Sequence, residues 1–488
     1  MLKTQFKSPN WNLYFGIFML LYAAYGFWSM PNFGSPTDEF TQRAIGMENA
    51  RFIAGNSEIK KIADHQFFGP IIETPLYLLE QLVYTQDISV KLYLRHSAIF
   101  LLFLLGLWVF FKLIKRLTAH EPAAFLGTAA LACNPRLFAH AHYNTKDTAF
   151  LCFVIFALYL FVKFLQTKEI KPLLFAAIWI GLATSIRLAG AFIGLACLST
   201  LVLAIKNNSK IYFYFVGLSI FSFILAFPYL WVHPFEGILD LLGYTSKNPY
   251  PWDVLFAGQM LSKGEGLWYY VPLSLGITIS IPVLILFLIY LIRSVKSILK
   301  NRFTHEQILL FQVFTLPILY FIFTSPVFYN MGRHTQFMLI PIYIGAATVI
   351  AAIWKNAMAK WASVGFLALS FLALPAYQGN EMVYFNGIKS LWKPYSFEMD
   401  YWTISTKNAL DDLLEDNEEV KVYTFDAASQ NSLNMMPAKD RKRISFTSKD
   451  SADYELDFFR DVPLKPTEKT NKSYGAKQEP YLLVNRLK

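Results

Sequence analysis

The sequence predicts an all-α polytopic membrane protein with about eleven transmembrane helices and a small C-terminal α/β domain. Three observations support this fold class. The 488 residues are 55% hydrophobic and only 16% charged, whereas soluble domains carry about 25% charged residues. The apolar residues gather in runs of about twenty, the length that crosses a bilayer core. Charged residues become frequent only after Tyr377, where the long apolar runs stop.

The apolar runs define the expected membrane spans. Residues 173–205 are apolar with Ser185 and Arg187 as the main interruption, and one helix of that length would reach about 50 Å, too long for the bilayer core. We therefore predict two helices that meet at Arg187. The first run lacks a clear cleavage site and is expected to be a retained helix. The expected spans are about 11–28, 97–118, 122–135, 148–165, 173–185, 188–205, 211–232, 270–292, 307–325, 335–354 and 361–377.

The distribution of basic residues predicts the orientation of these spans. With the break at Arg187, fifteen Lys and Arg residues fall in loops on one side of the membrane, which the positive-inside rule makes the cytoplasmic side. The N-terminus is then cytoplasmic, and the C-terminal domain is periplasmic or extracellular, beyond a cytoplasmic (inner) membrane. The polar segments on the outer side are a first loop at 29–96, a short loop at 136–147, a loop at 233–269 and the tail from 378.

Two domains are expected, a transmembrane module at 1–377 and an extracytoplasmic α/β domain at 378–488. In the tail, residues 403–416 have helical spacing, and 420–425, 443–447 and 481–484 have the composition of strands. Residues 464–479 are rich in Lys, Thr and Ser, which predicts a loose loop.

The net charge of +10 does not indicate a nucleic-acid partner. Residues before Tyr377 carry 28 basic and 16 acidic side chains, and the excess lies mostly in the short loops that set topology. The three cysteines lie in or at the ends of apolar runs, which favours packing over disulfides or zinc. We expect no cofactor and no resident metal, although a divalent ion remains an open alternative.

An acidic pair, Asp38 and Glu39, opens the first outer loop directly after the first span. Such carboxylates can supply a general base at the membrane surface. The competing interpretation is a helix cap, with Ser35 at the N-cap and Asp38 as the third helical residue. Arg43 lies one turn later, where it can pair with Glu39 or meet a lipid phosphate.

A second polar segment at 134–147 joins two spans and contains NPRLFAHAHYNTKD. Arg136 and Lys146 at the outer interface can bind a phosphate, or they can extend along the interface without a ligand. His140, His142 and Asp147 are potential metal ligands with no visible supporting residues. Arg187 in the tight outer hairpin is a further functional candidate, because charges near a span are costly.

The start of the tenth span carries Arg333 and His334, which are candidates because charges near a span are costly.

The absence of three motifs disfavours the chemistries that depend on them. The sequence has no Asp-x-Asp pair of the kind that clamps a metal and nucleotide, no phosphate-binding P-loop and no G-x-S-x-G nucleophile motif.

In order along the chain, these motifs resemble the GT-C membrane glycosyltransferases, in the branch of the protein O-mannosyltransferases and the aminoarabinose transferases of lipid A. The resemblance runs over nearly the whole chain. The motifs are Asp38-Glu39, residues 67–73 (FFGPIIE), residues 134–147, Gly332-Arg333-His334, Tyr384-Phe385-Asn386 and Asp400-Tyr401-Trp402.

The resemblance implies transfer of a sugar from a polyprenyl-phosphate carrier to an envelope acceptor at the outer membrane face, with inversion. The first-loop acid would be the base, which assigns catalysis to Asp38 with Glu39 beside it. The donor's phosphate and sugar would be bound by Arg43, Arg136, Lys146, Asp147, Arg187, Arg333 and His334.

Two hypotheses of other classes compete with a transferase. A transporter or flippase of lipid-linked saccharides would show repeats and charges near the membrane midplane, but here the charges gather at the outer ends of the spans. A scaffold that recruits envelope partners through its tail would tolerate replacement of Asp38 and Arg333.

Overall fold

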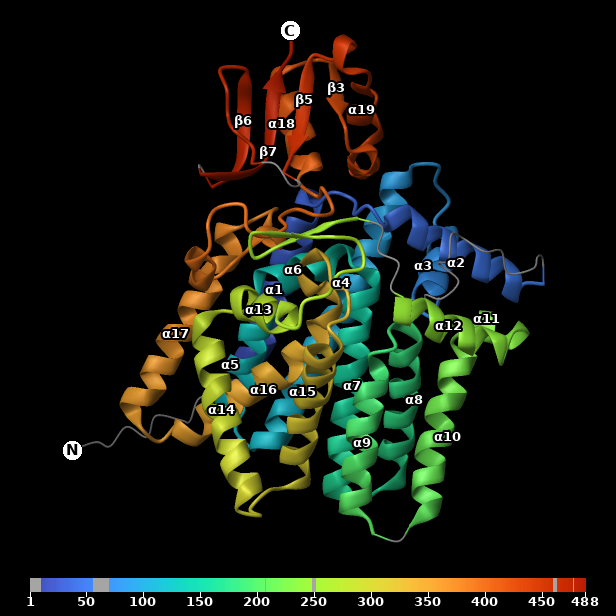
Figure 1. Cartoon of the computed structure of the whole chain (residues 1–488), viewed down its shortest axis with the longest axis vertical. Helices are drawn as coiled ribbons and strands as arrows, with labels where there is room; N and C mark the ends of the chain where they lie inside the picture. The colour runs from blue at the N-terminus through green and yellow to red at the C-terminus, as the bar shows by residue number, and fades with distance from the viewer. Residues whose placement is uncertain (1–9, 56–69, 207, 248–251, 460–462, 477) are drawn as a thin grey trace.

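The computed structural model describes residues 10–55, 70–206, 208–247, 252–459, 463–476 and 478–488. Figure 1 shows a bundle of long helices with a small sheet above one end. Residues 67–69, which belong to the FFGPIIE motif, lie outside the described residues.

A helix occurs within each of the eleven expected spans, as predicted. These helices are α1 (Trp11–Ser29), α4 (Ile88–Thr118), α5 (Glu121–Ala132), α7 (Thr145–Thr167), α8 (Ile170–Ile186), α9 (Gly190–Ala204), α10 (Ser209–Leu225), α14 (Ile281–Leu299), α15 (His305–Thr324), α16 (Leu339–Ile353) and α17 (Ala357–Ala376). In the described part of the chain, six helical segments are long and apolar enough to cross a membrane alone, and α8, α9 and α10 are apolar but shorter. The chain is therefore a multi-pass membrane protein.

The predicted break at Arg187 is confirmed. Helix α8 ends at Ile186, Arg187 is extended with φ −142° and ψ 125°, and α9 begins at Gly190. Arg187 therefore lies in the tight turn that joins the two helices.

Two expected spans are divided, and in both cases a proline lies in the first turn after the break. The span expected at 270–292 consists of α13 (Tyr270–Thr278) and α14, which has a proline in its first turn. The span expected at 211–232 ends with α10 at Leu225 and continues as α11 (Pro228–Val232). A proline lacks the amide hydrogen of a continuing helix and disfavours helical backbone before it.

Short elements lie between the bundle and the sheet (Figure 1). They include helices that pack against the outer ends of the long helices and one small hairpin. These elements are α2 (Glu39–Ile53), α3 (Glu73–Gln81), α6 (Pro135–Tyr143), α12 (Glu236–Lys247), β1 (Val254–Phe256) and β2 (Gln259–Leu261). The candidate site residues come from this layer and from the helix ends beneath it.

The tail forms a five-stranded mixed sheet in the order β4-β3-β5-β7-β6. Strand β3 is parallel to β4 and β5, whereas β7 is antiparallel to β5 and β6. The elements are α18 (Thr406–Asp416), β3 (Val420–Thr424), α19 (Ala438–Arg441), β4 (Ile444–Phe446), β5 (Tyr454–Phe458), β6 (Thr470–Ala476) and β7 (Glu479–Arg486). The predicted helix and three predicted strands are confirmed, but the loop expected at 464–479 is wrong. Residues 464–469 are irregular, but Thr470–Ala476 form β6, a largely exposed edge strand whose polar sequence carries no apolar alternation and whose pairing with β7 supplies the order.

The tail packs into the core of the membrane helices before it reaches the sheet. Phe397, Trp402 and Ile404 belong to the same buried cluster as the long helices, whereas Leu410 and Val422 belong to a separate cluster under the sheet. Residues 397–404 are therefore held against the bundle by this shared core.

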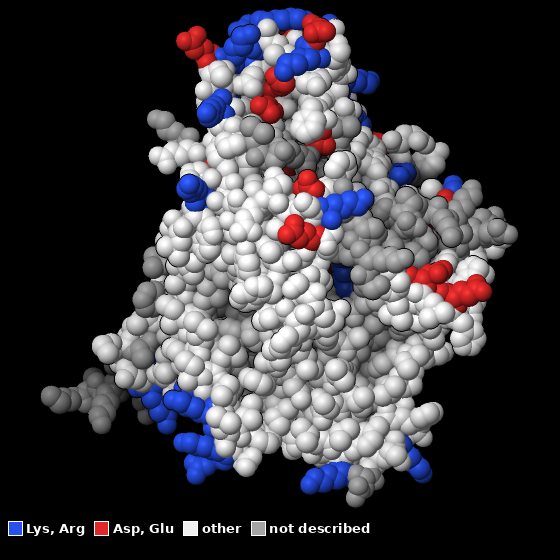
Figure 2. Space-filling view, viewed as in Figure 1, with Lys and Arg blue, Asp and Glu red and all other residues white. Residues whose placement is uncertain are grey.

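Charge follows the same layering on the face drawn in Figure 2. Lys and Arg side chains line the end of the bundle farthest from the sheet, a broad uncharged belt covers its middle, and charges of both signs cover the sheet (Figure 2). An uncharged belt of this kind matches the hydrocarbon region of a bilayer.

Candidate functional site

The two carboxylates of the first-loop acidic pair point in different directions. Asp38 occupies the N-cap position of α2, its side chain is 39% exposed, and its Oδ2 accepts a hydrogen bond from Arg333 Nη2 at 3.1 Å. The Glu39 side chain is only 1% exposed and turns into the protein. The alternative of a capping box is wrong, because α2 begins at Glu39 and the Ser35 N–H donates instead to Ser432 Oγ.

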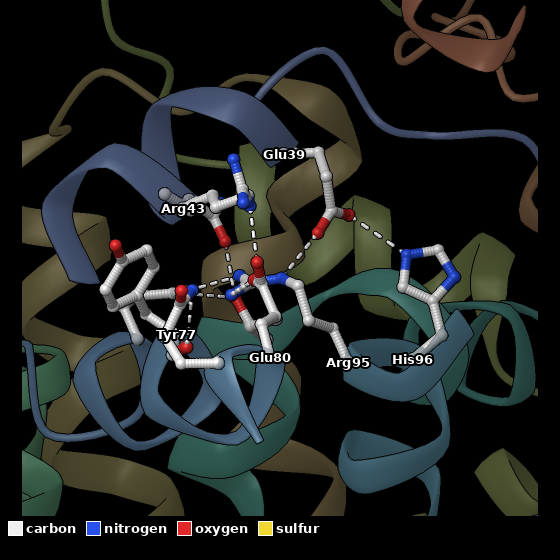
Figure 3. A network of polar contacts seen from close by, with 10 residues as sticks. Glu39, Arg43, Tyr77, Glu80, Arg95 and His96 are labelled. Carbon is white, nitrogen blue, oxygen red and sulfur yellow. Dashed lines mark hydrogen bonds and ion pairs between the residues drawn. The ribbon is translucent and has the colours of Figure 1, made fainter. Parts of the chain in front are cut away.

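Glu39 enters a buried network around Arg95, at the start of α4 (Figure 3). We call Arg95 with Glu39, Glu73 and Glu80 the Arg95 cluster. The guanidinium donates from Nε to Glu39 Oε1 at 3.0 Å, from Nη2 to Glu73 Oε2 at 2.6 Å and from Nη1 to Glu80 Oε1 at 3.1 Å. Each of these side chains is at most 1% exposed. One buried guanidinium therefore bonds three buried carboxylates, which would be costly to bury without such a partner.

The second Glu39 oxygen and the nearby Arg43 complete the network (Figure 3). Glu39 Oε2 lies 3.0 Å from His96 Nε2. Burial alone would raise the pKa of Glu39, but His96 and Arg95 together lower it below its usual value. Arg43 pairs with Glu80 at 2.6 Å, and not with Glu39 as its spacing suggested.

Asp147, in the first turn of α7, links two arginines from distant parts of the chain. Its Oδ1 accepts a hydrogen bond from Arg187 Nε at 2.9 Å and forms an ion pair with Arg187 Nη2 at 2.8 Å, and its Oδ2 lies 3.6 Å from Arg333 Nη1. Asn144, the N-cap of α7, orients the carboxylate by donating to Oδ2. Asp38, Arg333, Asp147 and Arg187 thus form a continuous line of alternating charge.

Lys146 and His334 lie beside this line of charges. Buried Lys146 is within electrostatic reach of Glu73, Asp38, Arg187 and Arg333. His334 packs its half-buried ring against Tyr329, with the centroids 4.8 Å apart. The structure therefore brings together Asp38, Lys146, Asp147, Arg187, Arg333 and His334, six of the nine residues that the sequence singled out.

Arg333 is presented by an unusual backbone turn. Asn330, Met331 and Gly332 all have positive φ, at 53°, 52° and 67°, and the first two are strained because they carry a Cβ. Glu398 supports the turn by accepting a hydrogen bond from the Met331 N–H at 3.3 Å. The turn precedes α16 and places the Arg333 guanidinium where it reaches both Asp38 and Asp147.

A pocket adjoins Arg333, and neither of the two aspartates lines it. It is lined by Asn134, Arg136, His140, Gln336 and Tyr401, among others, and by no Asp or Glu. Three buried polar atoms on its lining residues have no hydrogen-bond partner in the described structure, namely Arg136 Nη2, Arg333 Nε and Gln336 Oε1. Such atoms are costly without a partner, so the pocket is built for a polar ligand with negative charge.

Two contacts fix the Arg136 side chain and leave its positive charge available to a ligand in the pocket. Its Nε donates to the Tyr384 carbonyl at 2.7 Å, and its guanidinium lies 4.5 Å from the Phe385 ring centroid. Burial lowers the pKa of Arg136 from its ordinary value. No described carboxylate forms an ion pair with it.

The tail covers this pocket with Tyr401 and Trp402. The Tyr401 hydroxyl lies 3.1 Å from His140 Nε2, and Trp402 lies over the Arg333 guanidinium at 4.4 Å. Asp400 holds the segment by accepting hydrogen bonds from the Ile404 and Ser405 backbone N–H groups at 2.8 and 3.1 Å. These three residues are the Asp400-Tyr401-Trp402 motif, for which the sequence alone suggested no role.

The two histidines of α6 have separate partners. His140 lies between Asn144 and Tyr401, and burial lowers its pKa to about 3, which leaves it neutral. His142 bonds to the Phe138 and Gly26 carbonyls instead. Among the described residues, no three His, Cys, Asp or Glu side chains are grouped to hold a metal ion.

Comparisons with known proteins agree with the fold. A family described as dolichyl-phosphate-mannose-protein mannosyltransferase matches residues 94–231. The structure of ArnT from Cupriavidus metallidurans bound to undecaprenyl phosphate is similar with a TM-score of 0.54 at 12% identity, over 98% of this chain and 98% of ArnT. Its apo state gives 0.51 at 13%, over 97% and 98%. No curated protein matches the sequence. The predicted fold class and family resemblance are confirmed.

Proposed function

We propose that this chain, a membrane glycosyltransferase of the GT-C class, transfers a sugar from a polyprenyl-phosphate carrier to a hydroxyl of an envelope acceptor. The matching family is named for transferases that use dolichyl-phosphate mannose, and the similar ArnT structure holds undecaprenyl phosphate. The carriers in these two names, dolichyl phosphate and undecaprenyl phosphate, are both polyprenyl phosphates. The acceptor class, whether lipid, glycan or protein, stays open.

The observation that carries this proposal is the acid-free pocket beside Arg333. Its orphaned atoms, Arg136 Nη2 and Arg333 Nε, are guanidinium donors, which suit a phosphate. Gln336 Oε1, the third orphaned atom, is an acceptor and suits a sugar hydroxyl. A donor phosphate in this pocket would contact Arg333, whose Nη2 also bonds Asp38 at 3.1 Å.

The transfer step follows from this arrangement. Asp38 accepts the proton of the acceptor hydroxyl, whose oxygen attacks the anomeric carbon. The bond between that carbon and the phosphate oxygen breaks, and its electron pair leaves with the polyprenyl phosphate. Arg136 and Arg333 stabilise the negative charge that develops on the leaving group. Attack from the face opposite the phosphate gives inversion.

The remaining candidate residues support these groups. Lys146 contributes positive charge near the donor, while Asp147 holds Arg187 and Arg333 in place. His334 lies beside the same line of charges, with its ring against Tyr329. Arg43 was predicted to bind the donor and Glu39 to act in catalysis. In the described structure Arg43 pairs with Glu80, and Glu39 contacts Arg95 and His96. We therefore assign Glu39 to the Arg95 cluster and Arg43 to its edge.

We further propose that the site faces the outside of the cytoplasmic membrane. The basic loops lie at the opposite end of the bundle, which makes that end cytoplasmic. The module at 1–377 then supplies the donor site, and the domain at 378–488 covers it from the outer side.

The test is a mass-spectrometric survey of envelope glycans in a deletion strain complemented with wild type, Asp38→Asn or Asp450→Asn. Asp450 is an exposed acid in the C-terminal domain and serves as the matched control. We expect wild type and Asp450→Asn to restore a glycan, and Asp38→Asn to reach the membrane but lower transfer by about 100-fold or more. Full activity of Asp38→Asn would refute its role as the base, and no glycan change in any strain would refute the transferase.

A further inference from the structure

The Arg95 cluster joins four helices at the outer end of the bundle. Arg95 belongs to α4, Glu39 to α2, and Glu73 and Glu80 to α3. Glu73 also accepts a hydrogen bond from the hydroxyl of Thr145, the first residue of α7. The same hydroxyl contacts Gln42 of α2. Helices α2, α3 and α4 are therefore linked through one buried guanidinium, with Glu39, Glu80 and Arg95 labelled in Figure 3. Helix α7 joins them through the contact of Thr145 with Glu73.

Two of these contacts lie next to the proposed reaction groups. Glu39 directly follows Asp38, so the hydrogen bond from Arg95 to Glu39 fixes the backbone that carries the base. Thr145 directly precedes Lys146 and Asp147, so the contact from Glu73 to Thr145 fixes the backbone that carries the donor-binding residues. Arg95 thus lies between the two halves of the site without touching either.

The packing around the cluster leaves little freedom for these helices. A Cβ added at Gly46 of α2 would lie 2.2 Å from the Glu73 carbonyl oxygen, so α2 and α3 meet at backbone distance. Arg95 bonds the three carboxylates from three different nitrogens held in a planar fork, whereas the three donors of a lysine share one nitrogen. Lysine keeps the charge but cannot reproduce that geometry.

We propose that Arg95 is a positioning residue for transfer, which sets Asp38 relative to Lys146 and Asp147 through Glu39 and Glu73. This inference rests on the proposed function. Catalysis depends steeply on such spacing, because a misplacement of about 1 Å can cost about 100-fold in rate.

The kinetic test uses two substitutions with matched controls. Arg95→Lys keeps the charge, and Thr145→Val removes only the hydroxyl that links the cluster to α7. Arg51→Lys changes an exposed partner of Glu48, and Thr200→Val removes a buried hydroxyl that contacts Gln312. We expect kcat to fall by about 10-fold or more in both test variants, with donor KM within about 2-fold and controls unchanged. Each variant is also checked for membrane insertion and unfolding temperature.

A second measurement does not depend on activity. A spin label at Thr37→Cys reports the order of the backbone beside Asp38, since Thr37 is exposed and the three native cysteines are buried. We expect a broad, immobilised spectrum in the wild-type and Arg51→Lys backgrounds and a sharper, mobile spectrum with Arg95→Lys.

The outcomes separate the two proposals. Active, well-folded Arg95→Lys and Thr145→Val variants with unchanged kcat and an immobilised label would overturn the positioning role and leave the transferase intact. Losses that appear only in donor KM would also overturn it. A wild-type protein without transfer activity, but with a label that loosens in Arg95→Lys, would refute the proposed function and with it a role in transfer, and would leave only the finding that Arg95 orders the backbone beside Asp38.

Discussion

Trp402, from the tail, lies over the guanidinium of Arg333, with its ring centroid 4.4 Å from the central carbon. The ring is almost fully buried, while the same guanidinium reaches Asp38 and Asp147 with its two terminal nitrogens. The C-terminal domain therefore contributes directly to the geometry of the membrane site. A cation over an indole ring is stabilised by about 0.5–2 kcal/mol, more when water is excluded.

We predict that Trp402→Ala lowers kcat/KM for the donor by about 10-fold, because Arg333 loses the surface that holds it between the aspartates. Trp402→Phe should retain most of the activity, since a smaller ring still covers the guanidinium. Trp361→Ala, at a side chain that is 64% exposed, is the control. Equal activity of all three variants would show that the tail only covers the site.

Arg136 allows a prediction about donor binding alone. Arg136→Gln removes the orphaned Nη2 donor, and hydrogen bonds to charged groups are worth about 1.5–3 kcal/mol. We expect affinity for polyprenyl phosphate in nanodiscs, measured by native mass spectrometry, to fall by about 10- to 100-fold. Exposed Arg302→Gln should bind like the wild type. Unchanged affinity in Arg136→Gln would place the phosphate elsewhere.

Gly34 lies where the first outer loop meets the C-terminal domain. A Cβ there would come within 2.4 Å of Ser432 Oγ and 2.5 Å of the Ile404 carbonyl oxygen, and the latter cannot move without the backbone. We predict that Gly34→Ala destabilises this contact by about 1–3 kcal/mol and speeds proteolysis of the tail. Gly16→Ala, with nothing within 4 Å, should be cleaved like the wild type. Identical cleavage rates would mean that the interface adapts.

The sequence predicted the helices of the fold better than it predicted the contacts of the site. Run lengths and basic loops were enough for the spans and for the break at Arg187, because both signals are local. The pairing of Asp38 with Arg333 joins residues 295 positions apart, and no local pattern records such a contact. Each residue could be named as a candidate, but not as a partner of the other.

Arg95 shows a different limit of sequence reasoning. Its charge stands just before the span expected at 97–118, where basic residues commonly mark the end of a span, and nothing in the sequence singled it out. Its three partners come from other helices, and only packing turns a boundary residue into a buried hub. The missed strand β6 has the same cause, since its order comes from β7 and not from its own composition.

Glu381 makes the stability of the protein depend on pH. Its side chain is fully buried after the last span, beside Tyr143 and Asp400, and neither carboxylate oxygen has a hydrogen-bond partner among the described residues. Burial raises the pKa of Glu381 from 4.5 to about 8, against a smaller opposing effect of the nearby backbone at residues 379 and 381. The group is therefore neutral in the folded protein at pH 7 and ionised in the unfolded chain.

The sign of the effect follows from proton binding. Between pH 4.5 and about 8 the folded state holds one more proton than the unfolded state, so the free energy of unfolding falls as the pH rises. The slope from this one group is at most about 1.4 kcal/mol per pH unit. Glu381→Gln keeps the size of the side chain, cannot ionise and should flatten the slope. We expect the unfolding temperature of the wild type to decrease from pH 5.5 to 8.5 by more than that of Glu381→Gln, with exposed Glu415→Gln following the wild type. If the three curves ran parallel, the carboxyl group of Glu381 would have to be ionised or hydrated in the folded protein.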